Sequence, residues 1–75
     1  MTTTDTTKFI TPYSRLVELG MQHFYKSLSE KDKRHYSAIE ASKLGHGGIS
    51  YIAELFGCTR QTVSAGLEEL KKKSF

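Results

Sequence analysis

The sequence predicts an all-α fold: a bundle of three to four helices that contains a helix-turn-helix and follows a disordered N-terminal arm. Two observations predict it. Apolar residues recur at steps of three and four along most of the chain, which is the spacing of one helix face. Near the C-terminus, two short stretches with this spacing are separated by a sharp turn that contains a glycine. We therefore expect helices throughout.

The first half of the helix-turn-helix occupies residues 48–57. Its apolar residues share one buried face at helical spacing; they are Ile49, Ile52, Ala53 and Phe56. We expect Gly57 to end this helix, because glycine takes the left-handed conformation at little steric cost. Thr59 then begins the next helix, with its hydroxyl accepting a hydrogen bond from an unpaired amide of the first turn.

The second half carries an apolar stripe at Val63, Leu67 and Leu70, with Gly66 between them. A glycine inside a helix costs about 1 kcal/mol relative to alanine, so we expect another helix to cross closely at Gly66. A small residue, a turn glycine and a buried valine are spaced here as in homeodomain-like helix-turn-helix proteins; these residues are Ala53, Gly57 and Val63.

The N-terminal third contains an arm and one further helix. Residues 1–10 are rich in threonine and poor in apolar residues, so we expect a disordered arm, with Lys8 as its only basic side chain. We expect an amphipathic helix over 11–28, capped by Thr11 with Pro12 in its first position. Its predicted apolar side holds Tyr13, Leu16, Val17, Met21, Phe24, Tyr25 and Leu28, and its polar side holds Arg15, Glu18, Gln22 and Lys26. The apolar side is expected to form part of the core or to contact a second copy of the chain.

Residues 29–75 are expected to form the helix-turn-helix unit of three helices. Ser29 should cap its first helix, which ends at Gly45. Tyr36, Ile39 and Leu44 are predicted to point inward, and Lys31, Arg34, Glu40 and Lys43 outward. The following Gly45-His46-Gly47-Gly48 lacks the preceding strand and the Lys-Ser/Thr pair of a nucleotide-binding loop. We expect a flexible joint there, followed by amides near Ser50 that can hold a DNA phosphate.

Composition restricts the function. The chain has 75 residues, a net charge of +3 and one cysteine. This modest basic excess suits nucleic acid, and a single cysteine suits a reducing cytoplasm. No segment is long and apolar enough to span a membrane. The histidines, His23, His35 and His46, are far apart and Cys58 has no second cysteine nearby, so we expect no metal site, no cofactor, no small-molecule substrate and no catalytic activity.

The predicted binding site is the outward face of the last helix. Arg60 suits guanine or a phosphate, Gln61 suits adenine, and Ala65 can touch only a thymine methyl group. Ser64 can meet a base or a phosphate. The remaining candidates contact phosphate or backbone; they are Ser50, Thr59, Thr62, Lys71 and Lys72, followed by Lys73. Glu68 and Glu69 argue against deep insertion of the C-terminal half of this helix.

Several segments match a known family. They are L-S-E-K at 28–31, Tyr36, Glu40-Ala41, Lys43-Leu44-Gly45, G-G-I-S at 47–50, Ile52-Ala53, Gly57-Cys58, Thr62 and G-L-x-E-L at 66–70. Over its last two thirds the chain resembles the N-terminal DNA-binding segment of bacterial insertion-sequence transposases of the Rhodopirellula-type DDE class. The resemblance implies a helix-turn-helix that binds the ends of a mobile element.

Two differences from that family leave three functions open. The family tends to carry arginines where this chain has Ser64 and Ala65, and its catalytic domain does not follow within these residues. We expect an excised domain, a truncated remnant or a stand-alone relative. The first function is sequence-specific binding of double-stranded DNA as the end-recognition module of a transposase. The alternatives are a stand-alone transcriptional regulator that dimerises through helix 11–28, and a protein-interaction module that has lost DNA binding.

Overall fold

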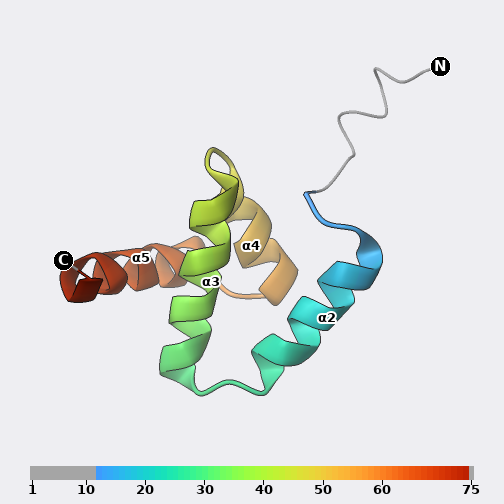
Figure 1. Ribbon diagram of the computed structural model, residues 1–75, viewed down its shortest axis with the longest axis horizontal. Helices are drawn as coiled ribbons and strands as arrows, with labels where there is room; N and C mark the ends of the chain where they lie inside the picture. The colour runs from blue at the N-terminus through green and yellow to red at the C-terminus, as the bar shows by residue number, and fades with distance from the viewer. Residues whose placement is uncertain (1–11, 75) are drawn as a thin grey trace.

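Four helices follow one another in the computed structural model, which describes the backbone of residues 12–74 and the side chains of residues 12–72. They are α2 (Arg15–Lys26), α3 (Glu30–Leu44), α4 (Gly48–Phe56) and α5 (Arg60–Ser74), and this part of the chain contains no strand. α3, α4 and α5 pack against one another, while α2 lies against α3 and α4 (Figure 1). The all-α helix-turn-helix fold is therefore confirmed. The arm over residues 1–10 and the Thr11 cap lie outside the described residues.

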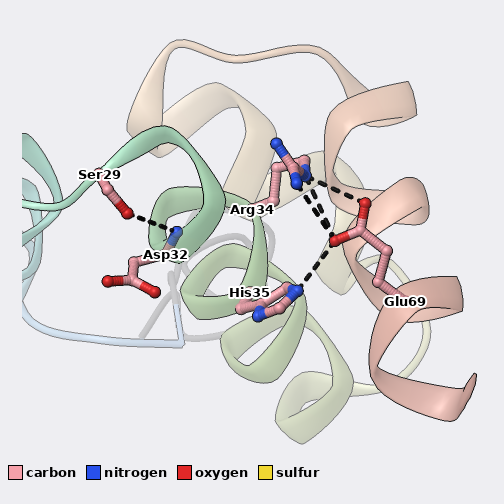
Figure 2. Close-up of polar contacts among 5 residues, drawn as sticks. All are labelled: Ser29, Asp32, Arg34, His35 and Glu69. Carbon is pink, nitrogen blue, oxygen red and sulfur yellow. Dashed lines mark hydrogen bonds and ion pairs between the residues drawn. The ribbon is translucent and has the colours of Figure 1, made fainter. Parts of the chain in front are cut away.

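The helix ends of the three-helix unit form where the sequence predicts them. The Ser29 hydroxyl accepts a hydrogen bond from the Asp32 amide at 3.1 Å (Figure 2). Gly57 ends α4 in the left-handed conformation, with φ 72° and ψ 29°. The Thr59 hydroxyl accepts from the Thr62 amide at 3.1 Å, so that α5 begins at Arg60. Each cap satisfies a backbone group that has no partner inside its helix.

Small residues allow α5 to cross α3 closely. Val63 and Ala38 are completely buried at this contact. A Cβ atom added at Gly66 would overlap the backbone oxygen of Arg34 and lie 3.1 Å from the Cβ of Ala38. The predicted close crossing at Gly66 is therefore confirmed. Gly48 serves the same purpose between α4 and α3, because a Cβ there would overlap the backbone oxygen of Ala41.

The helix predicted over 11–28 is shorter and turned differently. It begins at Arg15, not at Pro12, because the Ser14 hydroxyl accepts from the Val17 amide at 3.3 Å and caps it. Glu18 was predicted to face outward but is buried, where it accepts a hydrogen bond from the hydroxyl of Tyr51. The predicted apolar side is therefore partly wrong: Leu16, Val17 and Phe24 are 79%, 45% and 52% exposed, whereas Met21 is buried.

Polar and aromatic contacts explain this rotation of α2. Gln22, also predicted to face outward, donates from Nε2 to the backbone oxygen of Leu55 at 2.9 Å. The Tyr25 ring stacks on Phe56 of α4, with centroids 4.3 Å apart. Helix docking is thus decided here by hydrogen bonds and ring stacking, which satisfy buried polar groups that periodicity alone counts as solvated.

The inward face of α3 also differs from the prediction. Ile39 is 47% exposed, while Ser37, Ala38, Glu40 and Ala41 are buried. The small residues lie inward because α4 and α5 approach α3 closely at Gly48 and Gly66. Glu40 tolerates burial because the Tyr13 hydroxyl donates to it at 3.0 Å and Lys43 pairs with it at 3.3 Å. Ser37 donates to the backbone oxygen of Lys33 at 2.8 Å.

Candidate nucleic-acid interface

The N-terminal half of α5 presents an exposed polar face. Burial of Val63 and Gly66 against the bundle turns four of the predicted site residues to solvent: Arg60, Gln61, Ser64 and Ala65. Within residues 12–72, the side chains of Arg60 and Gln61 form no hydrogen bond or ion pair. A guanidinium and an amide that have no intramolecular partners are available for base edges or phosphates.

Thr59 and Thr62 have a structural role. Their hydroxyl oxygens lie 3.0 Å apart, and the Thr59 oxygen also accepts from the Thr62 amide. This arrangement occupies the Thr59 hydroxyl in capping α5 and leaves Thr62 half-buried. These hydroxyls were predicted to contact either the backbone or a phosphate. The structure shows the backbone contact, from the Thr62 amide to the Thr59 hydroxyl.

The remaining predicted site residues lie apart from this face. Lys71 and Lys72 are exposed on α5, about 16–18 Å along the helix from Arg60. The Lys71 ammonium lies 3.8 Å from the carboxylate of Glu68. Ser50 is exposed in the first turn of α4, roughly 10 Å along that helix from Gly57. The site is therefore one compact face with two outlying groups, and Lys73 lies outside the described side chains.

Carboxylates neutralise many of the basic side chains. Five ion pairs join a lysine or arginine to a carboxylate within residues 12–72, and they are Arg15–Glu18, Lys33–Glu30, Arg34–Glu69, Lys43–Glu40 and Lys71–Glu68. In the same residues, the basic side chains without an ion pair are Lys26, Lys31, Arg60 and Lys72. Two of these four lie on α5, one near each end. Arg34 and Lys43, which the sequence placed outward, are paired with carboxylates.

Glu69 fixes α5 to α3. Its carboxylate accepts hydrogen bonds from the Arg34 guanidinium, the shortest at 3.2 Å, and lies 2.9 Å from His35 Nε2 (Figure 2). The hydrogen bond from His35, together with those from Arg34, lowers the pKa of Glu69 below its ordinary value of 4.5. Sequence patterning missed this contact and counted Glu69 among outward residues. Only the three-dimensional approach of α3, set by Gly66, brings these groups together.

The described part of the chain brings no cluster of metal-ligating side chains together. No group of three or more His, Cys, Asp and Glu side chains is placed there to hold a metal ion. Cys58 is half-buried beside Tyr25. The pKa of the Tyr25 hydroxyl is raised, mainly because Tyr25 is partly buried and to a smaller extent because Cys58 lies next to it. None of the four helices has the length and apolar character needed to cross a membrane.

Comparisons with models of protein families, with curated proteins and with solved structures find no match to this chain. The helix-turn-helix geometry and the exposed face of α5 are therefore the observations on which a function can be proposed.

Proposed function

We propose that the chain binds double-stranded DNA, with the N-terminal half of α5 in the major groove. The observation that carries the proposal is the exposed face of α5 behind the Gly57 turn, where the side chains of Arg60 and Gln61 have no polar partner within residues 12–72. In helix-turn-helix proteins the residues at this place contact base edges. Arg60 would read guanine and Gln61 adenine, while Lys72 and Ser50 would contact phosphates.

The class of DNA follows from the sequence resemblance alone. The segments shared with insertion-sequence transposases favour the ends of a mobile element as the site, with this chain supplying recognition and no strand transfer. Since Ser64 and Ala65 replace arginines there, we expect fewer base contacts and weaker binding than an arginine-bearing helix would give.

Salt dependence tests the proposal. Anisotropy of a labelled duplex of mixed sequence and about 20 base pairs is measured at 50 and 200 mM NaCl. Two to three phosphate contacts predict an affinity loss of roughly 10- to 40-fold between these salt concentrations. A library of duplexes then selects the preferred sequence. Binding that does not change with salt would contradict the proposal.

A matched pair of variants locates the interface. Arg60→Ala and Lys31→Ala each remove one exposed positive charge that has no ion pair among the described side chains, on α5 and on α3 respectively. We expect Arg60→Ala to weaken binding about 5- to 100-fold and Lys31→Ala to change it by less than about twofold. Equal losses in the two variants would mean that α5 is not the reading helix.

A second candidate function is protein interaction, and one observation favours it. Glu68 is exposed and its pairing with Lys71 reduces the positive charge of α5. If α5 binds DNA, Glu68→Gln should strengthen binding a few-fold, because a carboxylate near phosphates is removed and Lys71 is released. If α5 instead binds a protein, this variant leaves DNA affinity unchanged.

A further inference from the structure

The outward side of α2 carries an apolar strip, which we define as Leu16, Val17, Gly20 and Phe24. The three large side chains are between 45% and 79% exposed, and one edge of the strip touches α3, where the Phe24 ring packs edge-on against Tyr36 with centroids 5.1 Å apart. Successive helix residues are about 100° apart, so these four residues lie on one side of α2 with Gly20 at its centre. The strip contains no charged residue, since Arg15 and Lys26 lie about a third of a turn away. Glu18 and Gln22 face the bundle on the opposite side.

The packing of residues 12–74 does not explain Gly20. A Cβ added there would find no atom within 4 Å, whereas one at Gly48 or Gly66 would overlap the backbone of α3. At those two positions the missing side chain lets a second helix approach closely. Glycine weakens a helix, so a glycine in open space at the centre of an apolar strip marks the place where a further helix crosses.

We propose that this helix is α2 of a second copy of the chain. Leu16 and Phe24 lie at equal distances before and after Gly20 on one row of the helix. In an antiparallel pair with its two-fold axis near Gly20, Leu16 of each copy therefore meets Phe24 of the other. The contact is self-complementary, as a two-fold interface requires. Because the strip is uncharged, two copies bring no like charges together, and antiparallel helix dipoles attract.

The position of α2 leaves the rest of the molecule accessible in such a dimer. Within the described residues α2 contacts α3 and α4 but not α5, which lies on the far side of the bundle (Figure 1). The proposed association therefore neither covers Arg60 and Gln61 nor depends on DNA binding, and it can be measured with the protein alone.

Sedimentation equilibrium between about 10 µM and 1 mM tests the dimer. We expect the wild-type mass to rise from monomer to dimer over this range. Leu16→Glu places a carboxylate in the strip, and we expect it to raise the dimer dissociation constant at least about 30-fold. Since Leu16 is 79% exposed, the fold should be kept, which circular dichroism verifies. Gly20→Leu should have a similar effect by preventing close approach.

Ile39→Glu is the matched control, because it places the same charge at a residue that is 47% exposed on α3. We expect it to dimerise like the wild type. Three outcomes would overturn the proposal: a wild-type chain that stays monomeric at 1 mM, a Leu16→Glu variant that still dimerises, or an equal loss in Leu16→Glu and Ile39→Glu. The first would assign the strip to a different protein.

Discussion

α5 and α2 are attached to the bundle in different ways. α5 crosses α3 at Gly66, where backbone lies almost against backbone and Val63 is completely buried. α2 is held by two polar contacts, from Tyr51 to Glu18 and from Gln22 to the Leu55 oxygen, by ring stacking and by the buried side chain of Met21. Leu16 and Val17 are exposed. Thus the helix with the candidate reading face is attached mainly by close packing, to which the Glu69 ion pair adds, whereas the helix with the apolar strip depends more on hydrogen bonds.

This difference sets how each helix should respond to change. Close packing has no room for added atoms, so one methyl group at the crossing displaces α5. Hydrogen bonds to buried groups contribute about 1 kcal/mol each and fail when one member is removed. We therefore expect α5 to be sensitive to added volume and α2 to lost polar groups.

The same substitution at two glycines gives the largest contrast. Gly66→Ala should lower the free energy of unfolding by about 2–3 kcal/mol, or the melting temperature by ~10–20 °C, because its Cβ overlaps the Arg34 backbone. Gly20→Ala meets no atom and should raise monomer stability by about 0.5–1 kcal/mol. Thermal unfolding of dilute protein followed by circular dichroism measures both. A Gly66 variant that melts like the wild type would contradict the close crossing.

Removal of the buried carboxylate on α2 gives the next largest effect. Glu18→Ala should cost about 1–2 kcal/mol, because it leaves the Tyr51 hydroxyl without this acceptor. Arg15→Ala removes a largely exposed guanidinium from its ion pair with the buried Glu18 carboxylate and should cost less, about 0.5 kcal/mol. Urea unfolding measures both values. In Glu18→Ala, amide hydrogen exchange should accelerate more over Arg15–Lys26 than over α5. Equal acceleration in both helices would mean that α2 does not unfold separately from the rest of the bundle.

The smallest expected effect is a pH dependence at the contact between α3 and α5. The pKa of Glu69 is lowered in the folded protein, so its contribution to stability is present above its ordinary value of 4.5 and is lost as the pH falls through the folded value. Glu69→Gln should therefore melt below the wild type at pH 7, and the difference should shrink as the pH falls through the lowered pKa of Glu69 in the folded protein. Glu68→Gln, next to it but paired only at the surface, should match the wild type over the same pH range.

Sequence reasoning succeeded where one residue determines the local structure. The Ser29 and Thr59 caps and the Gly57 turn are set by short-range chemistry, and all three form as predicted. The close crossing at Gly66 was also predictable, because a glycine inside a helix needs a reason. The same reasoning draws attention to Gly20, where an added Cβ would meet no atom within 4 Å.

The faces of α2 and α3 could not be predicted because periodicity treats every charged residue as solvated. Glu18 is buried because it accepts a hydrogen bond from Tyr51, and Glu40 because it accepts one from Tyr13. In each pair the two residues are more than 25 positions apart in the sequence. Glu69 likewise depends on Arg34 and His35 of another helix. For the candidate interface, exposure of Arg60 and Gln61 followed from the buried stripe of α5. The neutralisation of Lys71 by Glu68 shows that a count of basic residues overstates the free charge.

Binding of DNA by α5 is the central claim, and an amide chemical-shift titration tests it most directly. A duplex of about 20 base pairs is added to labelled protein at low and then at moderate salt. We predict shifts at residues 59–65, with smaller ones at Ser50, Lys71 and Lys72, that fade as salt rises, while Leu16 and Gly20 stay unchanged. The absence of shifts at low salt, or shifts concentrated on α2 instead of α5, would contradict the claim.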